Sequence, residues 1–150
     1  MASKSLTVNV TVTGARETLA AFNRMPREAN DSLRDRNTEL AVTLASRVAS
    51  AARGDSRQSA LVAPTVKARR DRIPSIQAGG TSRVGSRQVP AYKILFGSEF
   101  GARVLRQYRP HVGRGSYWMF KTVEENQPEI AAAWERVVAD IRRTFETGGL

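Results

Sequence analysis

The chain has 150 residues, a length that fits a single domain with a buried core, and we expect one domain over residues 1–150. It contains no cysteine, which excludes disulfides, thiolate metal sites and thiol nucleophiles. No signal peptide and no apolar stretch of about 18 residues occurs, so we expect a soluble chain with no membrane partner. The formal charge of +10 indicates an anionic partner, either nucleic acid or acidic protein surfaces.

The excess positive charge lies in the middle of the chain. Residues 53–114 hold thirteen of the 24 basic side chains but three of the 14 acidic ones, which leaves eleven of each sign in the two flanks. Arginine outnumbers lysine by twenty to four, and the guanidinium group binds carboxylates and phosphates with two parallel hydrogen bonds. A solvated basic loop is the simpler interpretation, but this pattern favours fixed contacts with anionic groups.

The first third of the chain predicts one strand and two helices. Apolar and polar residues alternate over residues 6–13, which is the period of a half-buried strand. Residues 15–25 predict a short helix, which Pro26 bends or ends. Apolar residues then recur at threes and fours over residues 27–53, and Gly54 closes this long amphipathic helix. It is longer than a compact core needs, which leaves part of it for a neighbouring subunit.

The middle of the chain predicts little regular structure. Residues 55–90 are rich in Arg, Ser, Gly and Pro, with a weak strand at 72–78 that Pro74 assigns to the edge of a sheet. The stretch 79–90 reads as a flexible segment. Residues 91–96 predict a second strand with its aromatic and branched side chains on one face.

A second flexible segment, about 101–116, leads to the apolar cluster 117–120 and the last helix. Acidic residues early in this helix and arginines late in it match the helix dipole, and Gly148 with Gly149 stops it. Two capping-box starts fit the spacing, Thr122 with Glu125 and Asn126 with Glu129.

Short strands and long helices favour an α+β fold, with a small, mostly antiparallel sheet packed against two long helices and with long Arg-rich loops. Trp118 and Trp134 both lie in apolar patterns, and we expect them in the core rather than on a surface.

Candidate catalytic groups are few. His111, the single histidine, follows a proline in a Gly-rich loop, and we expect a solvated side chain. The carboxylate pair Glu124 and Glu125 fits helix-start electrostatics better than acid–base chemistry. Residues 113–116 look like a phosphate-binding loop but lack its spacing. We therefore expect no enzyme, with no catalytic, cofactor-binding or metal-binding residue.

A motif in the second half of the chain carries a family resemblance. Glu99, Phe100 and Gly101 are followed by Trp118 and then by the helical sequence Thr-Val-Glu-Glu-Asn. This order resembles the siphophage neck or tail-completion proteins, in which a Glu-Phe-Gly motif leads through a variable loop to an aromatic residue and a long helix. The resemblance assigns structural roles to Glu99, Phe100, Gly101, Trp118, Val123, Glu124, Glu125 and Asn126.

The resemblance implies a viral structural protein of the bacteriophage virion, assembled in the host cytoplasm. Its subunits would form a ring, usually hexameric, around the DNA channel of the head-to-tail connector. Other neck proteins and the tail terminator or tail tube would be partners, with non-specific contact to channel DNA possible. Seven arginines are the candidate interface or channel residues: Arg69, Arg70, Arg72, Arg103, Arg106, Arg109 and Arg114. The alternative is a free, non-specific nucleic-acid-binding basic protein.

Overall fold

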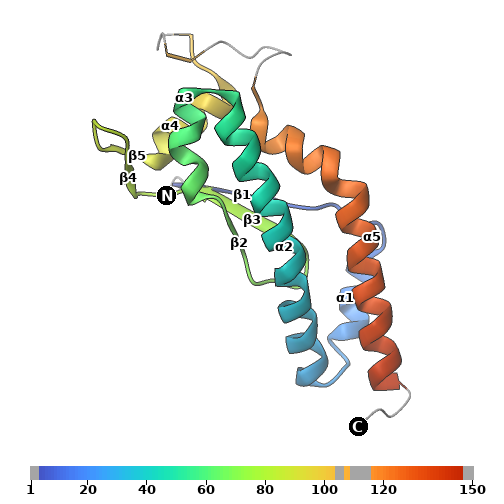
Figure 1. Ribbon diagram of the computed structural model, residues 1–150. Helices are drawn as coiled ribbons and strands as arrows, with labels where there is room; N and C mark the ends of the chain where they lie inside the picture. Colours follow the sequence, from blue (N-terminus) through green and yellow to red (C-terminus); the bar gives the residue numbers. More distant parts are fainter. Residues whose placement is uncertain (1–3, 104–106, 109–115, 147–150) are drawn as a thin grey trace.

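The structure is a computed structural model that describes residues 4–103, 107–108 and 116–146 (Figure 1). It confirms the predicted α+β class. The elements in chain order are β1 (Ser5–Asn9), α1 (Ala15–Phe22), α2 (Arg27–Asp55), α3 (Arg57–Val62), the 3-10 turn η1 (Ala63–Thr65), β2 (Lys67–Ala68), β3 (Ser75–Gly79), β4 (Arg83–Val84), β5 (Val89–Pro90), α4 (Ala91–Phe100) and α5 (Trp118–Glu146).

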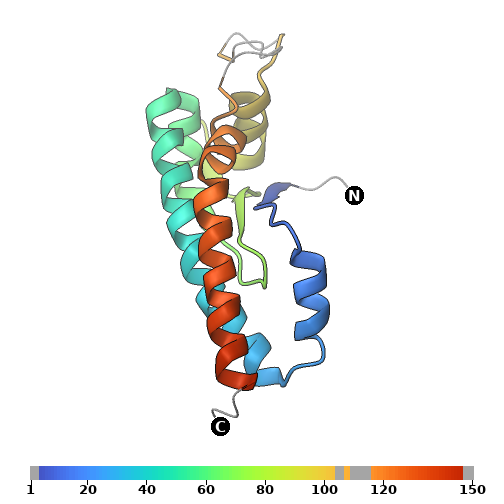
Figure 2. The same ribbon diagram turned by 90° about the vertical axis from the view of Figure 1, so that its right-hand side faces the viewer.

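Two long helices form the frame of the molecule. α2 and α5 have 29 residues each and lie side by side along most of their length (Figures 1 and 2). Their apolar positions join one core, as the spacing of threes and fours predicted. Trp118 and Trp134 are both buried, which confirms their assignment to the core. Pro128 lies inside α5, where its missing N–H removes one helical hydrogen bond.

A polar cluster joins the two helices at the surface. Arg47 of α2 donates hydrogen bonds to the side chains of Asn126 and Glu129 of α5. The hydrogen bond from Arg47 lowers the pKa of Glu129 below its ordinary value of 4.5.

This pair makes stability depend on pH. Because the pKa of Glu129 is lower in the folded chain, its stabilising effect is full above pH 4.5 and is lost as the pH falls through the folded-state pKa. We expect Glu129→Gln to flatten the acid limb of a plot of unfolding free energy against pH, measured by urea denaturation. Glu135→Gln, at an exposed position of the same helix, is the control. An unchanged acid limb in Glu129→Gln would contradict the expectation.

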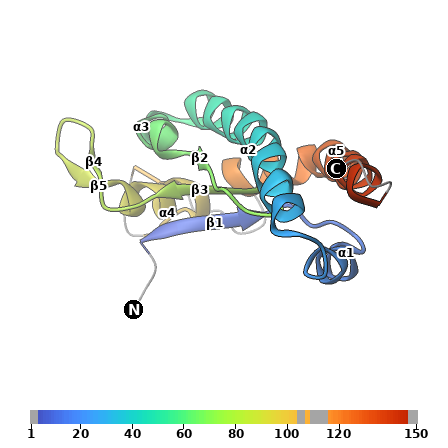
Figure 3. The same ribbon diagram turned by 90° about the horizontal axis from the view of Figure 1, so that it is seen from below.

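The sheet is antiparallel with strand order β1-β3-β2 (Figure 3). The alternation predicted over 6–13 is confirmed, since Val8, Val10 and Val12 are buried, although β1 itself ends at Asn9. The predicted edge position of strand 72–78 is wrong, because β3 lies between the two other strands. Pro74 precedes β3, so its missing N–H removes no hydrogen bond from β3. The carbonyl of Pro74 accepts a hydrogen bond from Val10 N at 2.9 Å.

The segment 55–90 holds more regular structure than its composition predicted. α3 starts with a capping box between Ser56 and Ser59, in which each side chain accepts from the other residue's backbone N–H. Within the stretch 79–90, β4 and β5 form a short antiparallel hairpin. Six residues of helix and two of strand are too short to give a readable period.

The predicted strand at 91–96 is wrong, because these residues begin α4. Ala91, Ile94 and Leu95 are buried at helical spacing, and Ser98 and Glu99 continue the same face. Pro90, directly before the helix, has the fixed φ that suits a helix start. Tyr92 and Phe96, whose even spacing suggested a strand, lie four residues apart and therefore one turn apart on the helix.

Candidate functional site

The motif residue Glu99 is the centre of the site. Its side chain is fully buried, and its carboxylate accepts from Met119 N at 2.8 and 3.0 Å and from Phe120 N at 3.2 Å. Both N–H groups belong to the first turn of α5, where backbone donors have no partner within the helix. The negative charge also suits the positive end of the helix dipole. The last turn of α4 therefore caps the start of α5.

Two further contacts fix the same junction. Trp118 Nε1 donates to Ser98 Oγ at 3.1 Å, and both groups are buried. Tyr117 N donates to the backbone oxygen of Glu99 at 3.2 Å. The end of α4 and the start of α5 are thereby joined directly, although the segment 101–116 separates them in sequence.

Both predicted capping-box starts of α5 are wrong. The helix begins at Trp118, so Thr122 and Asn126 are interior positions whose side chains donate to Trp118 O and Thr122 O at 2.6 and 2.8 Å. Glu129 bonds to Arg47 rather than to a backbone N–H. A side chain 20 residues away in sequence caps the helix, and local spacing cannot reveal that. The predicted stop at Gly148 and Gly149 lies outside the described residues.

The remaining motif residues divide between core and surface. Val123 is buried, whereas Glu124 and Glu125 are exposed beside each other on α5. Gly101 ends α4 with φ of 78°, a left-handed conformation that favours glycine. Phe100 lies at the surface, with 42% of its area exposed.

Five aromatic residues form a continuous strip over the α4–α5 junction, which we call the aromatic strip. Successive ring centroids lie 5.8 to 6.4 Å apart, within the range of favourable aromatic pairs. Phe100 is 42% and Phe120 38% exposed, and the other three members are half-buried. The members are Tyr92, Phe96, Phe100, Tyr117 and Phe120.

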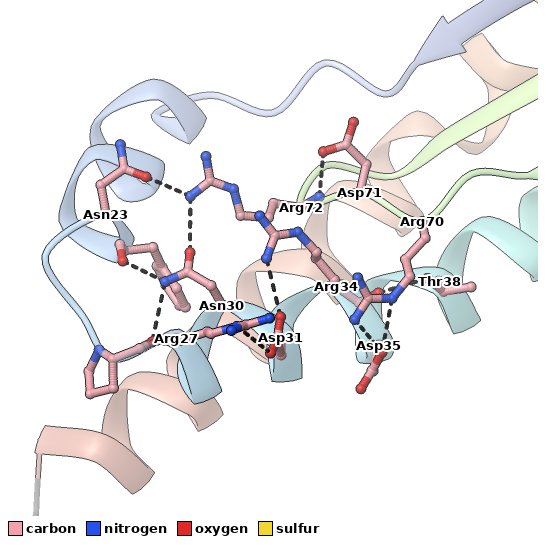
Figure 4. A network of polar contacts seen from close by, with 12 residues as sticks. Asn23, Arg27, Asn30, Asp31, Arg34, Asp35, Thr38, Arg70, Asp71 and Arg72 are labelled. Atoms are coloured by element: carbon pink, nitrogen blue, oxygen red, sulfur yellow. Dashed lines mark hydrogen bonds and ion pairs between the residues drawn. The ribbon is translucent and has the colours of Figure 1, made fainter.

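Two of the predicted arginine sites have partners within the chain (Figure 4). Arg70 donates to the carboxylate of Asp35 at 3.0 and 3.3 Å. Arg72 lies between Asn23 and Asn30 and donates to their side-chain oxygens at 2.8 and 3.0 Å. These contacts tie the loop between β2 and β3 to α1 and α2.

The backbone of this loop is held as well. Asn37 Nδ2 donates to Asp71 O at 2.7 Å, and Trp134 Nε1 donates to Arg72 O at 2.6 Å. α2 and α5 thus both hold the loop, which gives its two internally bonded arginines a structural role.

The two arginines differ in their expected effect on stability. Arg72→Ala removes the two hydrogen bonds from a charged donor to Asn23 and Asn30, and we expect it to lower the unfolding free energy by about 1 to 2 kcal/mol. Arg70→Ala removes an exposed ion pair, which is typically worth less than about 1 kcal/mol. Urea denaturation of both variants tests this, and an equal or larger loss for Arg70→Ala would contradict it.

Two of the other candidate arginines, Arg69 and Arg103, lie in the described part of the chain. Arg69 is exposed and makes one long contact, 3.5 Å, to Thr7 Oγ1, and Arg103 is exposed after α4. Arg106, Arg109 and Arg114 lie outside the described residues, as do His111 and most of the candidate phosphate loop at 113–116.

Within the described part of the chain, no three His, Cys, Asp or Glu side chains gather as metal ligands do. In the same residues, no helix has both the length and the apolar character needed to cross a bilayer. No protein-family model, curated protein or solved structure matches the chain.

Proposed function

We propose that the chain is a non-enzymatic structural subunit of a tailed-phage head-to-tail connector, where copies assemble into a ring around the DNA channel. The aromatic strip carries this proposal. Contiguous exposed apolar patches on a protein surface mark interaction sites, and two of the three large exposed apolar side chains of the described residues, Phe100 and Phe120, lie next to each other. The buried carboxylate of Glu99 fixes both helices beneath them, so the surface is held ready for a partner.

The order of residues along the chain supports the same proposal. The Glu-Phe-Gly motif and the later aromatic residue of the resembling family correspond to Glu99 and Trp118, whose contacts join α4 to α5. In this arrangement the motif residues hold α4 against α5 and support the aromatic strip, and they provide no nucleophile or base. Assembly is the function that such a motif serves best.

The test is to locate the chain in virus particles. We expect mass spectrometry of purified virions to detect the full chain, and electron microscopy with a gold-labelled antibody to place it between head and tail. A chain present in infected cells but absent from purified, tailed particles would refute the proposal.

The second candidate is a free nucleic-acid-binding protein, which the formal charge of +10 and the exposed Arg69 and Arg103 favour. Such a protein should bind duplex DNA tightly near physiological salt, with log affinity falling steeply against log salt. An unassembled connector subunit should bind the same duplex weakly. Fluorescence anisotropy over a salt series separates the two.

A further inference from the structure

Basic side chains lie close in sequence to the members of the aromatic strip. Lys4 Nζ lies 5.8 Å from the ring centroid of Tyr92, a cation–π contact at one end of the strip. Lys93 lies three residues before Phe96 on α4, and Lys121 lies four residues after Tyr117, whose backbone oxygen accepts from Lys121 N at 2.8 Å. These spacings bring side chains to neighbouring positions on a helix surface. Arg103 lies three residues after Phe100, beyond the end of α4. Within the described residues, no ion pair involves these last three cations, and all three are exposed. We call Lys4, Lys93, Arg103 and Lys121 the basic rim.

Among the described residues, three exposed acids lie near the strip or its rim: Glu124 and Glu125 of α5, and Asp55, which lines a hollow together with Glu125 and Lys121. Glu124, one helical turn beyond Phe120, is an exposed acid on the same side of α5. The carboxylate of Glu99 is buried and bonded to the start of α5. The four cations of the basic rim outnumber these three exposed acids, so the surroundings of the strip carry an excess of positive charge.

We propose that the aromatic strip docks an apolar segment flanked by acidic side chains, supplied by a different protein of the connector. This inference rests on the proposed function. Apolar side chains of the segment would cover Phe100 and Phe120, and its carboxylates would meet the basic rim. An apolar centre with a polar, charge-complementary edge is the usual anatomy of a protein interface.

A second copy of the chain fits the strip less well. Among the described residues, the other large exposed apolar side chain is Val42, 55% exposed, in an open hollow of about 410 Å³ between α2 and β2. Among the described residues that line this hollow, Arg53 and Lys67 are charged and both are basic. Seating this hollow on the strip would bring cations against cations, which disfavours the pairing.

Nucleic acid fits the strip less well too. Bases stack on open faces of aromatic rings. Here neighbouring rings are tilted by 33° to 72° and pack against one another, so their faces are partly used within the strip. The basic rim is then better matched by carboxylates beside an apolar segment than by a phosphate backbone.

Site-specific cross-linking in assembled particles tests the inference. Phe120 is replaced by the photoreactive analogue p-benzoylphenylalanine in the full chain, and purified virions are irradiated and analysed by mass spectrometry. We expect a cross-link to a different virion protein, in a segment where apolar residues are flanked by Asp or Glu. The same analogue at Val42, exposed on another surface, is the matched control and should not reach that segment.

Other outcomes overturn the inference. A cross-link from position 120 to a second copy of the chain, to DNA, or to a basic segment excludes the proposed partner, and so does the absence of any cross-link in particles that contain the chain. These results leave the chain in the virion and so leave the proposed function standing. Particles that lack the chain altogether refute the proposed function, and the inference with it.

Charge reversal provides a second, independent measurement. The double variant Lys93→Glu and Lys121→Glu, at two exposed positions, is expected to lower the cross-linking yield from position 120 by about tenfold. Lys67→Glu, a single reversal outside the basic rim, is expected to leave it unchanged. Circular dichroism checks that all variants stay folded, and an equal yield in folded double variant and wild type would contradict the role of the basic rim.

Discussion

Replacing Glu99 by alanine is expected to lower the unfolding free energy by about 3 to 5 kcal/mol. The substitution removes the acceptor of Met119 N, which is buried, and of Phe120 N, which is part-buried. It also removes the charge that favours the start of α5. Because these contacts are the main polar link between α4 and α5, we expect the aromatic strip to lose its fixed geometry as well.

Urea denaturation followed by circular dichroism measures this effect. Glu99→Gln keeps one acceptor oxygen and nearly the same shape, so its loss should be clearly smaller than that of Glu99→Ala. Glu125→Gln changes an exposed carboxylate on α5 and should stay within about 0.5 kcal/mol of wild type. A Glu99→Ala variant as stable as Glu125→Gln would show that the carboxylate is not needed for the junction.

Trp134→Ala is the second substitution for which we expect a large loss, about 3 to 5 kcal/mol. Trp134 is almost fully buried in the core shared by α2 and α5. Its indole N–H also donates to Arg72 O at 2.6 Å, so alanine leaves both a cavity and an unpaired carbonyl. The loop between β2 and β3 should loosen together with the core.

Two readouts separate these contributions. Denaturation gives the total loss, and hydrogen exchange of the backbone from Asp71 to Ile73 reports on the loop. Trp134→Phe fills most of the cavity but lacks the donor, so it should keep more stability than Trp134→Ala while still loosening the loop. Unchanged exchange in both variants would contradict the role of the indole N–H.

Sequence periodicity predicted the elements that are long or regular. The alternation before Thr13 and the spacing of threes and fours in α2 and α5 reflect contact with one continuous core, and such contact leaves a repeating pattern. The burial of Trp118 and Trp134 followed from the same pattern. These features depend on local order along the chain, which the sequence displays directly.

The failed prediction at residues 91–96 has a simple physical cause. A stretch of six residues with alternating apolar positions can be a strand. It can equally well be a helix whose two opposite sides are both apolar. α4 has buried residues such as Leu95 on one side and the aromatic strip on the other, so both of its faces carry apolar groups. Only the continuation to Phe100, four residues after Phe96, distinguishes the helix.

The site depends on contacts between distant residues, and no local pattern encodes those. The resemblance selected Glu99 as a structural residue, but its role as the cap of α5 depends on a hydrogen bond across 20 residues. The partner of Arg70 is Asp35, on a helix that comes much earlier in the chain. The clustering of arginine therefore predicted anionic contacts, but it gave no means of telling an internal partner from an external one.

The pairing of α2 with α5 has a consequence for synthesis of the protein. α2 emerges from the ribosome early, with its apolar side facing no partner, and α5 completes the core only after most of the chain has been made. Contacts of such large sequence separation slow folding and leave apolar surface open in the meantime. A nascent chain stalled before Trp118 should accordingly recruit chaperones, and release of the final helix should end that dependence.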